Sequence, residues 1–296
     1  MSLQRITENY YLSLPLAILC IFLPLLNWVS LSWGVLMVLR NNVYLGAVSL
    51  GMLTFLCFFI VNGLRFYGSL AEWFALLVFF GPLWCMAYSL RLWRSLKLSV
   101  QLGFGLLLII TVINSFIYGP ITYDELYQTL ANRMAWGDGG GDVELVASIQ
   151  QIYLQTMVTT FLVAWPAVLF LMHVLLLLSA RYFQSRWYHP GGFKQEFHAL
   201  RLSSWMCIPF LVIFLWAILA PSQLALQAAG LVALLYTIAG IAWLHWFIAF
   251  KHWTWVWVAV MYGILFVLSA WAMPLLILIA LLDSSINLRQ KLINRV

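Results

Sequence analysis

The sequence predicts an all-α protein: a polytopic bundle of eight to ten transmembrane helices, in which the first and last helices are short or broken. Hydrophobic residues make up 65% of the 296 residues and charged residues only 8%, whereas about a quarter of a soluble domain is charged. The charges also leave six long uncharged runs, 9–39, 41–64, 98–123, 145–180, 202–250 and 253–282. Because one membrane-spanning helix needs about 20 apolar residues, residues 1–296 are expected to form a single integral membrane domain.

The lengths of the apolar runs predict the individual spans. Residues 10–39 would form a helix of roughly 45 Å, which exceeds a bilayer core of about 30 Å. Pro24 and Asn27 lie near its middle, so we expect two short arms, about 10–26 and 28–39. The last run, 253–282, has the same excess length and contains Pro274, and it is either one kinked helix or a short hairpin. The remaining spans are predicted at about 43–63, 71–90, 98–118, 149–180, 203–220 and 223–249.

The basic residues predict which ends of the spans face the cytoplasm. With a cytoplasmic N-terminus, most Lys and Arg residues between spans lie inside and most acids lie outside, as the positive-inside rule requires. The connection 181–203 is then cytoplasmic and 119–148 is extracytoplasmic. The rule favours the hairpin for 253–282, because the basic C-terminal tail then also lies inside. Topology therefore accounts for the net charge of +6, and no nucleic-acid partner is expected.

The cytoplasmic connection contains a chain break followed by an amphipathic segment. In "HPGG" (189–192), proline cannot continue a helix and the glycines adopt any backbone conformation. In "FKQEFHALRL" (193–202), Phe193, Phe197 and Leu200 recur with helical spacing, which is typical of a short helix on the membrane surface. This segment is either a structural tether or a docking site for a cytoplasmic partner or an anionic ligand.

Acidic residues are rare at the cytoplasmic ends and are expected to form ion pairs. Glu196 is the only acid in 181–203, and Asp283 is the only acid near the basic C-terminal tail. If both segments are cytoplasmic, Asp283 can pair with Arg201 or Arg289, and Glu196 can pair with a neighbouring base.

The segments "PGGFKQEFHALRL" (190–202) and "DSSINLR" (283–289) resemble the uncharacterised YybS-like family of bacterial predicted membrane proteins. That family is distantly similar to the substrate-binding membrane components of energy-coupling-factor vitamin transporters. The resemblance implies a small-molecule-binding protein of the bacterial inner (plasma) membrane that works with a partner in transport. It carries over no catalytic role. The matching motif positions are Gly191, Gly192, Phe193, Glu196, Phe197, Leu200, Arg201, Asp283 and Arg289.

The chain departs from such transporter components in its small-residue surfaces. Those components use a small-xxx-small surface on the first helix to meet their partner, whereas the first apolar run here has none. The clearest stripe is Ala225, Ala229 and Ala233, which we expect to allow close packing of two helices. The departure weakens the inference of transport.

The extracytoplasmic connection offers no catalytic or metal-binding motif. Thr122 and Glu125 fit a capping box, so 123–135 is expected to be a surface helix, and "GDGGGD" (137–142) lacks the spacing of a calcium-binding loop. The four cysteines lie inside apolar runs and form no CxxC pair. We therefore expect no catalytic residue, no cofactor and no metal.

One polar stripe within a span is the candidate binding surface. Gln151, Gln155, Thr159 and His173 share one azimuth of a helix over 149–180 and are expected to face the protein interior. They either make interhelical hydrogen bonds or line a polar cavity open to the outside. The preferred function is therefore binding of a small-molecule or lipid-like ligand, related to transport. The alternative is a non-transporting membrane scaffold or assembly partner, and a membrane enzyme ranks third because no acid–base pair is evident.

Overall fold

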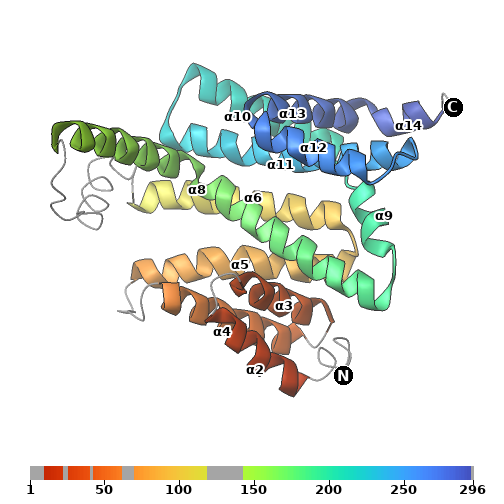
Figure 1. The fold of residues 1–296 in the computed structure, drawn as a ribbon, viewed down its shortest axis with the longest axis horizontal. Coiled ribbons are helices and arrows are strands. Elements are labelled where there is room, and N and C mark those ends of the chain that lie inside the picture. The colour runs from red at the N-terminus through yellow and green to blue at the C-terminus, as the bar shows by residue number, and fades with distance from the viewer. Residues whose placement is uncertain (1–9, 23–25, 41–42, 62–69, 119–142, 295–296) are drawn as a thin grey trace.

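The computed structural model is a bundle of helices that lie side by side along one axis, with a short helix across one end (Figure 1). The structure describes residues 10–22, 26–40, 43–61, 70–118 and 143–294, and within these ranges it contains no strand. This confirms the predicted all-α fold. The predicted surface helix 123–135 and the loop 137–142 lie outside the described residues.

The first apolar run is folded back on itself. Helix α2 spans Tyr10–Ile21 and helix α3 spans Asn27–Arg40. The Ser30 hydroxyl of α3 donates to the Ala17 carbonyl of α2 at 2.7 Å, although the two residues would be about 20 Å apart along one continuous helix. The prediction of two short arms is therefore confirmed.

Four long helices follow the first hairpin. They are α4 (Val43–Val61), α5 (Leu70–Trp93), α6 (Leu96–Tyr118) and α8 (Val143–Tyr188). Helix α8 extends beyond the predicted span 149–180 at both ends. Close contact between α3 and α4 depends on Gly46, where an added Cβ would lie 2.6 Å from Cα of Val38.

A cross-helix and two further passes come next in the chain. Helix α9 (Gly192–His198) lies across the end of the bundle where α8 ends (Figure 1). The 3-10 helix η1 (Ser204–Met206) leads into α10 (Cys207–Leu219), which is followed by α11 (Gln223–Phe250). The predicted spans 203–220 and 223–249 agree with these bounds.

The last apolar run is also a hairpin. Helix α12 (Val256–Val267) and helix α13 (Ser269–Ile286) are separated only by Leu268, and α14 (Leu288–Ile293) follows. The two helices run in opposite directions, and the C-terminus lies at the same end of the bundle as α9 (Figure 1). Helix α13 packs tightly along α11, because a Cβ on Gly240 would lie 2.5 Å from the Leu276 carbonyl oxygen.

Basic residues gather at the α9 end, as the charge distribution predicts. The guanidinium of Arg40 lies 4.2 Å from the centre of the Tyr188 ring at the end of α8. Arg91 donates to the Val38 carbonyl at 3.0 Å. The ends of α3, α5 and α8 therefore meet the α9 connection on one side of the bundle.

The chain is a multi-pass membrane protein. Among the described residues, six helices are long and apolar enough to cross a membrane, by length and composition: Val43–Ile60, Glu72–Trp93, Leu96–Ile117, Thr160–Tyr188, Gln223–Phe250 and Ser269–Ile286. The further passes needed for eight to ten spans are shorter helices, including the apolar segments Ser204–Leu219 and Val256–Val267.

Candidate functional site

A cavity of about 470 Å³ lies between α4, α5, α6 and α8. Its lining comes from the second halves of α4 and α6 and from the first halves of α5 and of the α8 membrane span, so it occupies the end of the bundle opposite α9. The wall is largely apolar and rich in aromatic rings, from Phe58, Phe74, Phe79, Phe161 and Trp165, and Leu169 adds an aliphatic side chain. Such a lining suits an apolar or amphiphilic molecule.

Few polar groups line this cavity. The Thr54 hydroxyl donates to the Leu50 carbonyl of its own helix at 2.8 Å. Cys57 and Asn114 also contribute to the lining. The sparse polar groups could orient one end of a mostly apolar ligand, but they do not form an acid–base pair.

His173 lies directly behind the cavity wall. It is fully buried, and its ring meets the ring of Phe79 edge-on with centroids 5.2 Å apart. Neither ring nitrogen makes a hydrogen bond of standard geometry among the described residues, although the Phe79 backbone lies close enough to interact with the ring. An unsatisfied polar group inside a membrane protein is costly, and Phe79 is the side chain that separates this imidazole from the cavity.

A second cavity, of about 590 Å³, lies along α8 itself. Its lining includes Tyr153, Thr156 and Met157. Both cavities share three side chains, Phe161, Trp165 and Leu169. These three residues follow one another at single-turn spacing on α8, so one stripe of this helix forms a wall common to the two cavities.

The predicted polar stripe does not line either cavity as a unit. Gln155 is exposed, and it lies on the part of α8 that precedes the membrane-spanning segment Thr160–Tyr188. His173, in contrast, is completely buried. Gln155 therefore does not share the interior position of His173. The side chains of Gln151 and Thr159 lie outside the described residues.

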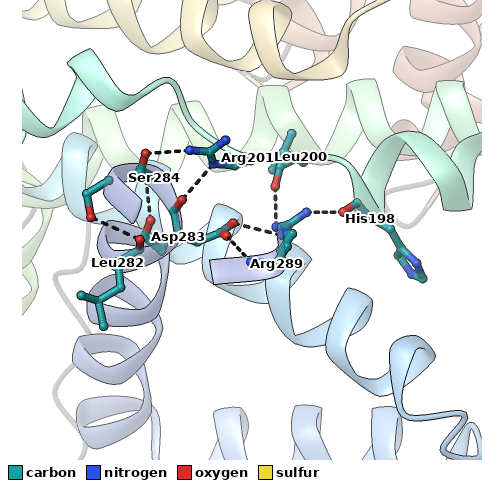
Figure 2. A network of polar contacts seen from close by, with 9 residues as sticks. His198, Leu200, Arg201, Leu282, Asp283, Ser284 and Arg289 are labelled. Atoms are coloured by element: carbon teal, nitrogen blue, oxygen red, sulfur yellow. Dashed lines mark hydrogen bonds and ion pairs between the residues drawn. The ribbon is translucent and has the colours of Figure 1, made fainter. Parts of the chain in front are cut away.

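At the α9 end, Arg289 ties the C-terminal segment to the connection between α8 and η1 (Figure 2). Its Nε lies 3.0 Å from the Asp283 carboxylate, and its backbone N–H donates to the other oxygen of that carboxylate at 3.3 Å. Its two Nη groups donate to the carbonyls of His198 and Leu200, the latter at 2.8 Å. One buried guanidinium thus binds the Asp283 carboxylate of α13 and two backbone carbonyls at the end of α9.

Arg201 makes the reciprocal connection (Figure 2). It donates to the carbonyls of Asp283 at 2.8 Å and Ser284 at 3.1 Å, both in the last turn of α13. The Ser204 hydroxyl also donates to the Ser284 carbonyl, at 2.8 Å. C-terminal helix carbonyls lack intrahelical partners and carry partial negative charge, so a cation is stabilised there. We call these contacts of Arg201, Asp283 and Arg289 the arginine lock.

The predicted ion pairs are confirmed. Asp283 pairs with Arg289, while Arg201 binds the backbone carbonyl of Asp283 and not its carboxylate. Glu196 forms a two-pronged ion pair with Arg181 near the end of α8, in which Nε donates at 2.8 Å.

The predicted chain break is also confirmed. Helix α8 ends at Tyr188 and α9 begins at Gly192. Gly191 has a φ of 87°, a left-handed conformation that glycine adopts without steric cost. Phe193 and Phe197 stack with ring centroids 5.8 Å apart, and Leu200 is 1% exposed. The apolar face of this segment therefore packs on the bundle.

His198 gives this end of the protein a titratable group. Burial is the main cause that lowers its pKa from the ordinary 6.5 to about 4, and the nearby charges of Lys194, His245 and Arg289 contribute to the same shift. The imidazole is therefore neutral at pH 7, beside the guanidinium of the arginine lock.

The predicted alanine stripe lies on α11 with unequal burial. Ala225 is fully buried, whereas Ala229 and Ala233 are half-buried. The closest approach to another backbone on α11 occurs elsewhere, at Gly240 against α13. Sequence reasoning missed this position, since a lone glycine in an apolar run carries no sign of its neighbour.

Among the described residues, no cluster of three or more His, Cys, Asp or Glu side chains could hold a metal ion. No protein-family model, curated protein or solved structure matches the chain.

Proposed function

We propose that this membrane protein binds a small apolar or amphiphilic, lipid-like molecule in the four-helix cavity and takes part in its transport. The observation that carries the proposal is the cavity itself, of about 470 Å³, walled mainly by aromatic and aliphatic side chains. Ligand pockets are typically about 300–1,000 Å³ and largely apolar, with a few polar groups that fix orientation.

The position of the cavity supports access from outside a bacterial inner membrane. The cavity occupies the end of the bundle opposite α9. The positive-inside rule assigns the α9 end, with Arg40, Arg91 and Arg181, to the cytoplasm. The cavity would then receive its ligand from the outer leaflet or the extracytoplasmic space.

We propose the α9 connection as the contact for a cytoplasmic partner because it is charged and amphipathic. The resemblance to the YybS-like family implies only that a partner is needed. Arg201 separates this role from a purely structural one. If the connection docks a partner, Arg201→Ala should abolish copurification of that partner without lowering thermal stability. If Arg201 acts only within the arginine lock, the same variant should lose stability in isolation.

Ligands copurified from membranes test the proposed binding. Native mass spectrometry of the purified protein should show a bound small molecule, released on unfolding and identified by its fragments. Ala75 lines the cavity, so Ala75→Trp should remove that molecule. Ala259 is exposed on α12, away from this cavity, and Ala259→Trp should retain it.

The same measurement decides between binding and scaffolding. Equal loading of parent and Ala75→Trp protein would show that the cavity is not the site. A protein that carries no copurified molecule and binds none when single-chain or two-chain lipids are added would favour the non-transporting scaffold.

A further inference from the structure

Helix α8 contains a proline in the middle of its membrane span. Pro166 lies inside Val143–Tyr188, and proline has no backbone N–H. In an α-helix that N–H would bond the carbonyl four residues earlier, which belongs to Leu162. Because the membrane interior supplies no water to replace the missing donor, the Leu162 carbonyl needs a partner from another helix.

Two glutamines of α11 supply that partner. Gln227 is 4% exposed, and its amide nitrogen donates to the Leu162 carbonyl at 2.6 Å. Gln223, one turn earlier, approaches the same oxygen at 3.4 Å. The start of α11 is itself held by Ser222, whose hydroxyl accepts from the Ala225 N–H at 3.2 Å.

The acceptor lies next in the chain to residues that line both cavities. Leu162 follows Phe161, and Pro166 follows Trp165 in the chain. Phe161 and Trp165 line both cavities. A change in the angle of α8 at Pro166 therefore moves Phe161 relative to the inner half of the helix and changes the width of the four-helix cavity.

We propose that Pro166 is a hinge in α8 and that Gln227 is its latch. With the Gln227 amide bound to Leu162, the outer arm of α8 is held against α11 and the cavity has the width seen in the structure. When this bond opens, the outer arm swings about Pro166 and changes access to the cavity. The consequence for a ligand rests on the proposed function, but the hinge and its latch do not.

Distances between spin labels test the latch without any ligand. Tyr153 on the outer arm is 59% exposed and Phe116 at the end of α6 is 82% exposed. Both are replaced by labelled cysteines in a chain without the four native cysteines, reconstituted in lipid nanodiscs. Gln227→Leu should broaden the distance distribution and add a second population. Gln223→Leu, which removes only the longer contact, should change it much less.

A second substitution distinguishes a latch from general loosening of the core. Pro166→Ala restores the N–H that Leu162 lacks, so alone it should narrow the distribution. Gln227→Leu added to Pro166→Ala should then have little further effect. The proposal is overturned if Gln227→Leu leaves the distribution unchanged, or if Pro166→Ala fails to suppress its effect. If Gln227→Leu does not fold, an unchanged distribution in Pro166→Ala alone overturns it.

The outcome is independent of the ligand measurement. If the label distances respond as expected but the protein binds no ligand, the hinge and latch are supported and the proposed function is refuted. The opposite result is that the parent protein carries its ligand but Gln227→Leu leaves the distances between the spin labels unchanged. That result would refute only the latch.

Discussion

Removing the Arg289 side chain should destabilise the protein more than any exposed charge substitution. Asp283 is 2% exposed and Arg289 is 8% exposed, so Arg289→Ala leaves a buried carboxylate without its counter-ion. Breaking a buried ion pair from one side typically costs about 3–5 kcal/mol. The carbonyls of His198 and Leu200 lose their donor as well, and each buried unsatisfied acceptor adds about 1–3 kcal/mol. Because these terms overlap, we expect a total loss of about 4–6 kcal/mol.

The assay is equilibrium unfolding of the purified protein in mixed micelles with increasing SDS, followed by helical circular dichroism. Arg186 provides a matched control, because it is exposed and its guanidinium bonds only the Tyr182 hydroxyl, at 3.0 Å, among the described contacts. Arg186→Ala should change the free energy of unfolding by less than about 1 kcal/mol.

A double variant isolates the ion pair from the carbonyl contacts. Replacing both charges, with Asp283→Leu and Arg289→Met, leaves no buried charge, and such replacements are often tolerated. The double variant should therefore lose clearly less stability than the sum of the losses measured for Asp283→Leu alone and Arg289→Met alone. A cost below about 1 kcal/mol for Arg289→Ala, or strict additivity in the double variant, would show that the charges of the arginine lock are not buried as the structure describes.

Three further outcomes follow from burial, packing and charge. Because the pKa of His198 falls from 6.5 to about 4 on folding, the unfolded chain binds a proton at this histidine before the folded chain does as the pH drops. The contribution of His198 to stability should therefore be complete above pH 6.5 and be lost as the pH falls toward 4. In a profile of melting temperature against pH, His198→Asn should flatten this decline. Gly240→Ala should cost about 1–3 kcal/mol in the same unfolding assay through overpacking, whereas Gly263→Ala, where an added Cβ meets no atom within 4 Å, should be nearly neutral. In intact cells, an impermeant thiol reagent should label Ala220→Cys and spare Lys194→Cys, and labelling of both from one side would contradict the assigned topology.

The hairpins could be predicted because they follow from length and charge. An apolar run longer than the bilayer core must break or tilt. At the C-terminus the basic tail favoured a break, because a hairpin places that tail on the same side as the other basic residues. The position of the second break could not be predicted in the same way. Pro274 is the helix-breaking residue that the sequence offers in this run, but Pro274 lies inside α13, and α12 and α13 separate at Leu268. Proline marks a helix that can bend, while tertiary packing decides where it does.

The arginine lock was predictable in its partners but not in its geometry. Few acids occur at this end of the chain, so the pairing of Asp283 and Glu196 with neighbouring bases was nearly forced. Arg201, which follows α9, binds carbonyls in the last turn of α13, and Arg289 in α14 binds the carbonyls of His198 and Leu200. This exchange depends on how α9, α13 and α14 are placed, which no local pattern encodes.

The cavity was not predictable from the sequence. Phe161, Trp165 and Leu169 are apolar residues within an apolar run, and nothing in their type distinguishes a face toward lipid from a face toward a void. Gln227 carried a usable signal, since a buried amide in a span requires a partner. Its partner is a backbone carbonyl on another helix, and only the register between α8 and α11 identifies it.

The arginine lock also constrains how the polypeptide can be made. Arg201 and its acceptor on Asp283 are 82 residues apart in the chain, and three apolar helices, α10, α11 and α12, lie between them. During synthesis at the membrane, the end of α9 must therefore wait, with its carbonyls and its arginine solvated by water or headgroups, until α13 has been inserted. A ribosome stalled before Asp283 would leave a nascent chain whose earlier helices are in place but whose arginine lock is still open. In such an intermediate the arginine of the α9 end and the carbonyls of His198 and Leu200 lack the partners that α13 and α14 supply, so the chain reaches its final set of polar contacts only when its last helices arrive.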